Sequence, residues 1–149
     1  MKNYRTPPNH KTASKLNEKV LLLKLMPGMD GTVLNRLFPH YDAVVIEAFG
    51  VGGLPEYGEV SFYAEIRRWT DAGKIVMMAT QVTHEGSDME VYRVGRVIKE
   101  NFHLMEAYDM TLEATVTKVM WALGQTKEPE QFRRLFYKTV NHDLLLAVL

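Results

Sequence analysis

The densest group of polar side chains in this sequence lies in residues 80–88 (TQVTHEGSD), directly after an apolar run. Hydroxyl, amide and carboxylate groups gathered at the end of a buried strand can bind a small polar ligand. Ser87 and Glu90 also match an S-x-x-E capping box, and Asp88 suits the positive end of the helix that such a box begins. On residue types alone, a structural role for this loop is therefore favoured over a catalytic one.

A second candidate site is the glycine-rich loop of residues 50–55 (GVGGLP). A G-x-G-x-x-G dinucleotide fingerprint that began at Gly50 would need a glycine where the chain has Pro55. The Lys-Ser or Lys-Thr pair of a Walker loop is also missing at the required spacing. We therefore expect these glycines to serve a tight turn at a strand end rather than a phosphate group.

Several other chemistries are excluded or unsupported by residue type. The chain has no cysteine, which rules out disulfides, thiolate zinc sites and a cysteine nucleophile. The histidines at positions 10, 40, 84, 103 and 142 have no metal-binding spacing, and only His84, beside Glu85, follows a predicted strand. No G-x-S-x-G elbow is present. We expect no metal and no cofactor, and the residues alone reveal no catalytic constellation.

Composition points to one globular domain in the cytoplasm. The chain has 149 residues, and 18 lysine and arginine residues balance 18 aspartate and glutamate residues. Such a balance gives no footprint for nucleic acid or acidic membranes. Residues 1–14 lack the apolar core of a signal peptide, and the longest apolar runs are too short to cross a bilayer. Neither nucleic acid nor a membrane is an expected partner.

The elements that position these loops alternate between strand and helix. Apolar runs at 20–26, 43–48 and 75–79 predict buried parallel strands, and helical spacing predicts helices over 33–38, 62–70, 87–102, 112–123 and 132–140. Gly73 and Gly124 are expected to end two of these helices. Residues 1–18 show no periodicity and predict a linker or tail.

This alternation predicts an α/β fold over residues 19–149. We expect a three-layer helix–sheet–helix arrangement around a small parallel (Rossmann/flavodoxin-like) sheet of about four strands. In such sheets the functional surface lies beyond the carboxyl ends of the strands, which here means residues 26–30, 49–55 and 80–87. Glu47 and Thr80, which stand at two of these ends, form a candidate ligand site.

Several colinear segments, from about residue 16 to 140, closely resemble the type I (cytoplasmic-type) L-asparaginases. They are 24–29 (KLMPGM), 45–55 (VIEAFGVGGLP), 80–81 (TQ), 85–89 (EGSDM) with Tyr92 and 94–96 (VGR), 109–111 (DMT), 113–115 (EAT) and 117–124 (TKVMWALG). The likeness is to the C-terminal domain of that family. A weaker likeness is to the asparaginase-like subunit of the archaeal glutamyl-tRNA amidotransferase.

The resemblance implies an amidohydrolase that converts L-asparagine to L-aspartate and ammonia through a covalent acyl intermediate. The family's nucleophilic threonine lies in a T-G-G-T-I-like segment of an N-terminal domain, and this sequence has no such segment. We therefore expect no catalytic residue in this chain, and no activity from it alone. L-Asparagine becomes a ligand only when the catalytic domain is present.

In the family, the C-terminal domain packs in dimers or tetramers and borders the active site of a neighbouring subunit. The matching positions are Gly53, Glu85, Ser87 and Asp88. Type II relatives have an asparagine that reaches this site at the position of Gly53, and glycine has no side chain to do so. Type I enzymes often have cysteine where this chain has Val82, and a bacterial allosteric type has arginine at the position of Glu47, so no regulatory asparagine site is expected. Expected partners are further copies or a missing N-terminal asparaginase domain. Two alternatives are a stand-alone binding or oligomerisation module, and a subunit of a split amidohydrolase or amidotransferase-like complex.

Overall fold

The computed structural model describes residues 15–50, 52–81, 104–140 and 143–144. Within them, four strands form one sheet in the order β1-β2-β3-β4, and every neighbouring pair is parallel. These strands are β1 (Val20–Lys24), β2 (Ala43–Ala48), β3 (Ile75–Thr80) and β4 (Met105–Glu106). Because parallel neighbours run in one direction, all four carboxyl ends lie at one edge, called here the carboxyl edge.

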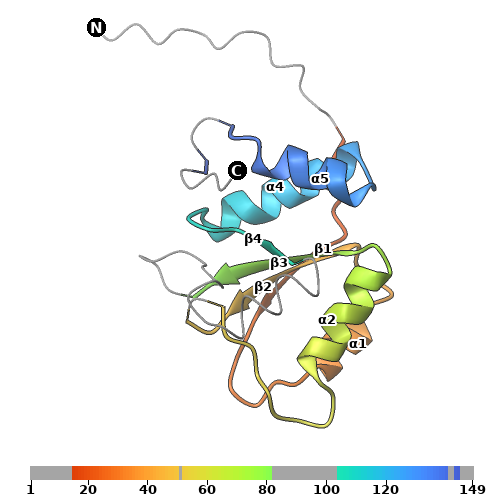
Figure 1. Ribbon diagram of the computed structural model, residues 1–149, viewed down its shortest axis with the longest axis vertical. Helices are drawn as coiled ribbons and strands as arrows, with labels where there is room; N and C mark the ends of the chain where they lie inside the picture. The colour runs from red at the N-terminus through yellow and green to blue at the C-terminus, as the bar shows by residue number, and fades with distance from the viewer. Residues whose placement is uncertain (1–14, 51, 82–103, 141–142, 145–149) are drawn as a thin grey trace, which may run out of the picture.

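In the described part of the chain, two pairs of helices sandwich the sheet, so the predicted three-layer α/β fold is confirmed (Figure 1). They are α1 (Thr32–Leu37) and α2 (Phe62–Asp71) on one face, and α4 (Leu112–Gln125) and α5 (Pro129–Tyr137) on the other. Successive side chains of β2 point alternately to the two helical layers. Val44 and Ile46 pack toward α1 and α2, whereas Ala43 and Val45 pack toward α4 and α5. All six residues of β2 are buried, Glu47 included, as its mainly apolar run predicts.

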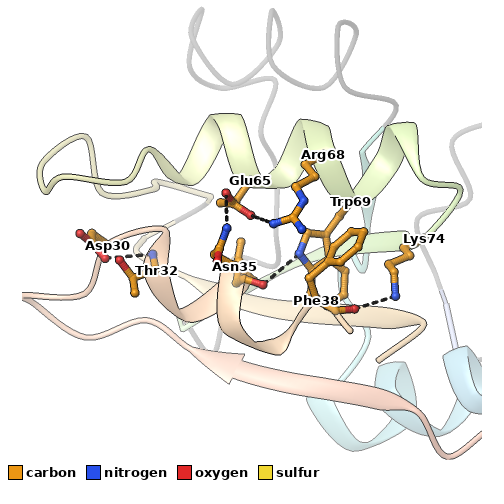
Figure 2. A network of polar contacts seen from close by, with 9 residues as sticks. Asp30, Thr32, Asn35, Phe38, Glu65, Arg68, Trp69 and Lys74 are labelled. Atoms are coloured by element: carbon orange, nitrogen blue, oxygen red, sulfur yellow. Dashed lines mark hydrogen bonds and ion pairs between the residues drawn. The ribbon is translucent and has the colours of Figure 1, made fainter. Parts of the chain in front are cut away.

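The α1–α2 pair is held by side chains that bond to one another and to the helix backbone (Figure 2). Glu65 accepts from Asn35 Nδ2 at 3.1 Å and from Arg68 at 3.3 Å, and Trp69 Nε1 donates to the carbonyl of Leu34 at 3.2 Å. Glu65 is buried and Trp69 is fully enclosed. The polar side chains of Asn35, Glu65 and Trp69 thus find their hydrogen-bond partners within this helical layer.

Beyond the end of α1, Lys74 performs a similar role. Its ammonium donates to the carbonyl of Phe38 at 2.8 Å and to that of Tyr41, and it lies 4.6 Å from the centre of the Phe38 ring. The Phe38 ring meets the Trp69 ring edge-on at 5.7 Å. A cation at these carbonyls offsets the negative end of the short helix α1.

Gly124 does not end its helix, contrary to the prediction from sequence. It lies inside α4, which continues to Gln125. A Cβ at Gly124 would sit 2.0 Å from the carbonyl oxygen of Lys15, so the glycine allows the incoming chain to pass against the helix. Asn17 N donates to Met120 O at 2.9 Å along the same helix. Gly73, by contrast, has φ +74° just beyond α2, as expected of a glycine that ends a helix.

The last predicted helix begins and ends earlier than expected, because α5 runs from Pro129 to Tyr137 and Val140, beyond it, is 46% exposed. The chain beyond it is tied back to α4. Lys118 Nζ donates to Lys138 O at 2.8 Å and pairs with Asp143 at 2.7 Å. Leu144 is buried in the core on the α4–α5 side. The predicted helix over 87–102 lies outside the described residues, and the predicted boundary at residue 18 stays a prediction.

Candidate functional site

Gln81 ties together three strand ends at the carboxyl edge. Its backbone N–H donates to Ala48 O at 3.2 Å, and its side-chain Nε2 donates to Leu25 O at 2.9 Å and Glu47 O at 3.0 Å. These carbonyls belong to the exits of β1 and β2, whereas Gln81 itself follows β3. One amide side chain therefore fixes where three neighbouring loops begin.

The loop after β2 is a closed turn built on glycine. Phe49 and Gly53 form an antiparallel bridge, with Phe49 N donating to Gly53 O at 3.0 Å and Gly53 N donating to Phe49 O at 2.7 Å. Gly50 has φ +51° and Gly52 has φ +140°. Residues other than glycine rarely adopt these backbone angles. The sequence-based interpretation of this loop as a tight turn is therefore confirmed. Thr80 Oγ1 donates to Gly50 O and anchors the turn to β3.

Glu47 and Thr80 point to opposite faces of the sheet. Thr80 is in register with Ala48, whose side chain packs toward α1 and α2. Glu47 precedes Ala48 in the same strand, so its side chain points to the other face. There Lys24 Nζ donates to Glu47 at 2.9 Å, and the Glu47 side chain is only 10% exposed. A ligand that touched both residues would have to bridge the strand ends.

A second carboxylate, Asp30, joins the loop after β1 to the loop before α2. It accepts from Thr32 N at 2.9 Å, from Glu59 N at 3.1 Å and from Val60 N at 3.4 Å. Hydrogen bonds from the Thr32 hydroxyl and backbone, and then from Val60 and Glu59, lower the pKa of Asp30 below its usual value. An ionised Asp30 thus holds the two loops side by side.

Small residues make this approach close. A Cβ at Gly58 would sit 2.3 Å from the Cβ of Asp30, and one at Gly31 would sit 2.7 Å from Ser61 O. Gly28 N donates to the hydroxyl of Tyr57 at 2.8 Å, a further link between the loops. Burial and then the adjacent carboxylate of Glu56 raise the pKa of Tyr63, near the start of α2, above its ordinary value.

Comparison with known proteins settles the family. The model of the glutaminase/asparaginase C-terminal domain matches residues 19–136. The chain belongs to that family. An L-asparaginase from Thermococcus kodakarensis is 36% identical over 130 residues, which are 87% of this chain and 39% of that enzyme. The structure titled the thermostable L-asparaginase from that organism has a TM-score of 0.79 at 33% identity, covering 88% of this chain and 39% of that one.

One further relative and one further structure complete the comparison. A glutamyl-tRNA(Gln) amidotransferase subunit from Thermofilum pendens is 34% identical over 133 residues, which are 88% of this chain and 28% of that protein. L-Asparaginase I of Vibrio cholerae shares the fold, with a TM-score of 0.75 at 22% identity over 89% of this chain and 39% of that one. The chain thus spans about two fifths of the L-asparaginases that it matches, and less of the amidotransferase protein.

Of the predicted bordering residues in this asparaginase domain, the described part of the chain contains Gly53 alone. Gly53 lies in the closed turn, where a Cβ would approach Phe49 O at 3.2 Å. Glu85, Ser87 and Asp88 lie outside the described residues. Across the described ranges, no three histidine or acidic side chains are grouped to hold a metal ion, and no helix is long and apolar enough to cross a membrane.

Sequence reasoning missed the two residues that organise the edge of this asparaginase domain. From sequence, Gln81 was only one member of the polar loop at residues 80–88 and was given no role. Asp30 was only the last residue of the predicted strand-end segment 26–30. Asp30 carried a usable signal. An Asp one residue before a glycine and two before a helix start is typical of a side chain that bonds to nearby backbone N–H groups. Gln81 carried none, because its acceptors lie 34 and 56 residues away in the chain.

Proposed function

We propose that this chain is the C-terminal domain of an L-asparaginase and borders the active site of a neighbouring subunit. The family match over residues 19–136 carries the proposal, and the 36% identity to an L-asparaginase supports it. Hydrolysis of the amide requires a nucleophile, a base and an oxyanion site. In this proposal these come from an N-terminal catalytic domain, and the chain supplies shape and neighbouring contacts.

The described geometry at the carboxyl edge fits a supporting role. The side chains of Gln81 and Thr80 donate to backbone carbonyls, and Asp30 accepts from backbone N–H groups. Groups used in this way set the position of loops rather than attack a substrate. Gly53, Glu85, Ser87 and Asp88 would border the substrate in trans, and the candidate ligand site of Glu47 and Thr80 stays a proposal.

The test compares the chain alone with the chain joined to a catalytic partner. The region of the Thermococcus enzyme outside the match would be fused ahead of residue 1, and ammonia release from L-asparagine would be measured. We expect no activity from the chain alone and turnover from the fusion. Ammonia release by the isolated chain that is lost in Thr80→Val would refute the proposal, because catalysis would then lie in this domain.

A second function is supported by the 34% identity to a glutamyl-tRNA(Gln) amidotransferase subunit, which is no better a match than the L-asparaginase. In that case the chain would serve a complex that acts on glutamyl-tRNA(Gln). The fusion would then show a tRNA-dependent release of ammonia, which an L-asparaginase does not need. The remaining alternative, a stand-alone binding module, would bind L-asparagine without any catalytic partner, and calorimetry on the isolated chain detects that.

Self-association is part of the proposal, as is a cytoplasmic location. Leu16, Leu22 and Met26 are each 45% or more exposed along β1 and its flanks. Apolar patches on a surface mark places where proteins meet. We expect a dimer or larger assembly by sedimentation at tens of micromolar, roughly where weak interfaces form. A strict monomer at that concentration would count against the homo-oligomer.

A further inference from the structure

The glycine loop owes its position to the strand beside it. Three donors from Thr80 and Gln81 reach the exit of β2: Thr80 Oγ1 to Gly50 O, Gln81 N to Ala48 O at 3.2 Å, and Gln81 Nε2 to Glu47 O at 3.0 Å. The loop is closed on itself by the Phe49–Gly53 bridge. The loop closes on Phe49, which directly follows β2, so anchors on this exit steady the Phe49–Gly53 bridge and decide where Gly53 lies.

The side chain of Gln81 reaches further than its neighbours on the strand. It passes the end of β2 and donates to Leu25 O at 2.9 Å on the exit of β1. Leu25 N in turn donates to Glu47 O at 3.1 Å, so this carbonyl accepts from both Leu25 and Gln81. The amide therefore continues the sheet one step beyond its last regular pairing, Lys24 with Glu47.

Only a side chain that donates hydrogen bonds suits the position. Both acceptors are carbonyl oxygens, which accept and cannot donate. Methionine has nearly the shape of glutamine but no donor, and glutamate would place a negative oxygen against two carbonyl oxygens. Lysine is longer but can still donate to both. Substitutions at this position can therefore separate the effect of losing the hydrogen bonds from the effect of changing the size of the side chain.

The geometry points to Gln81 as a positioning residue that sets the glycine loop, and with it Gly53, for the neighbouring active site. This inference rests on the proposed function for its catalytic meaning. The placement of the loop does not depend on the reaction and can be measured by itself. Gln81 touches no reacting atom in this proposal and acts through the loop.

The chain contains a matched control in Gln125. Its Nε2 also donates to two backbone carbonyls, Lys15 O at 2.9 Å and Trp121 O at 3.0 Å. Gln125 ends α4, where the chain that leads into the start of β1 passes. Gln125→Met likewise removes two hydrogen bonds from an amide side chain to backbone carbonyls, but away from the carboxyl edge. A general loss of stability should appear in both variants, whereas displacement of the loop should appear in one.

The first experiment measures amide hydrogen exchange in the isolated chain. We expect Gln81→Met to speed exchange at Leu25 and Gly53 by about fivefold or more, the effect of losing one ordinary hydrogen bond. Gln125→Met should instead speed exchange at Asn17, whose N–H bonds to α4. Gln81→Lys should restore much of the protection at Gly53. Equal exchange at Gly53 in the wild type, Gln81→Met and Gln125→Met would overturn the inference.

The second experiment measures kcat/KM for L-asparagine in the fusion with the catalytic region. We expect a loss of about tenfold or more in Gln81→Met, because a small misplacement of a bordering loop is costly to turnover. Gln81→Lys should recover part of it, and Gln125→Met should match the wild type. Full kcat/KM in Gln81→Met would overturn the inference and leave the proposed function standing. An inactive wild-type fusion would refute the proposed function alone, since hydrogen exchange still decides the loop.

Discussion

The α1–α2 pair and the carboxyl edge hold their parts together in opposite ways. Between the helices, the side chains of Asn35, Glu65 and Arg68 bond to one another beside the enclosed ring of Trp69 (Figure 2). At the carboxyl edge, Gln81 and Asp30 bond to the backbone of loops far away in the chain. The first arrangement stabilises a packed layer, and the second fixes the path of loops. The two regions should therefore respond differently to substitution.

Trp69→Ala should have the largest effect on folding. The ring is fully buried, packs edge-on against Phe38, and donates its N–H to Leu34 O. Truncation of a large buried aromatic side chain costs about 3–5 kcal/mol, a large share of the stability of an ordinary domain. Urea unfolding followed by circular dichroism measures it. A loss below about 1 kcal/mol would show that the helix pair is not the stabilising layer.

Much of this architecture could be predicted from the sequence, because it depends on local pattern. The mainly apolar runs predicted β1, β2 and β3 to within two residues at each end. No run marked β4, which has only two residues and depends on pairing with β3. The prediction at Gly124 was wrong because a glycine near the end of a helical pattern most often terminates the helix. Here it serves a close contact with Lys15, which no local pattern reveals.

The candidate site was harder to predict, for the same reason. The turn at residues 49–53 could be inferred, since glycines carry its positive φ angles. The roles of Thr80 and Gln81 could not, because their acceptors are backbone carbonyls brought near by the sheet. A polar residue at a strand end looks alike in sequence whether it faces a ligand or a carbonyl. The family resemblance supplied the hypothesis of a substrate-bordering site, and the structure supplied the contacts of its described residues.

Gly52→Ala tests the carboxyl edge with the next largest effect. Gly52 has φ +140°, whereas Gly53 does not have a positive φ. An alanine at position 52 should cost about 1–3 kcal/mol in backbone strain. Gly53→Ala is the matched control and should cost less, because its Cβ needs only a small shift of Phe49 O. Glu85→Ala should be nearly silent for stability, within about 0.5 kcal/mol. Equal melting-temperature losses in all three variants would contradict the assignment of this turn.

Removing an ion pair from each region should change the free energy of unfolding by less than the glycine substitution does. Lys24 lies 2.9 Å from Glu47, whose side chain is 10% exposed, whereas Arg67 and Asp71 are 3.9 Å apart and well exposed. Lys24→Ala removes the cation from a mostly buried carboxylate and should cost about 1 kcal/mol. Arg67→Ala should cost about 0.5 kcal/mol or less. Chemical denaturation of both variants checks the ranking, and the reverse order would mean that Glu47 does not depend on Lys24.

Asp30→Asn should give the clearest pH signature of these variants. Hydrogen bonds from Thr32, Val60 and Glu59 lower the pKa of Asp30 in the folded state below the ordinary value of 3.8. A group whose pKa is depressed by folding adds stability above its unfolded pKa and loses it as the pH falls through its folded pKa. The melting-temperature advantage of the wild type over Asp30→Asn should therefore be constant from pH 8 to about pH 5 and shrink below about pH 4.

Asp71→Asn is the control for this pH profile, because Asp71 lies on the exposed side of α2, 73% exposed and 3.9 Å from Arg67. The difference between two variants of one protein cancels the titration of the carboxylates they share. We expect the Asp71 difference to stay flat while the Asp30 difference falls with pH. A flat profile for Asp30 as well would mean that its carboxylate is not held by the loop N–H groups. The two loops would then keep their places through Gly28 and Tyr57, and through the bond of Gly31 N to Val60 O at 2.7 Å.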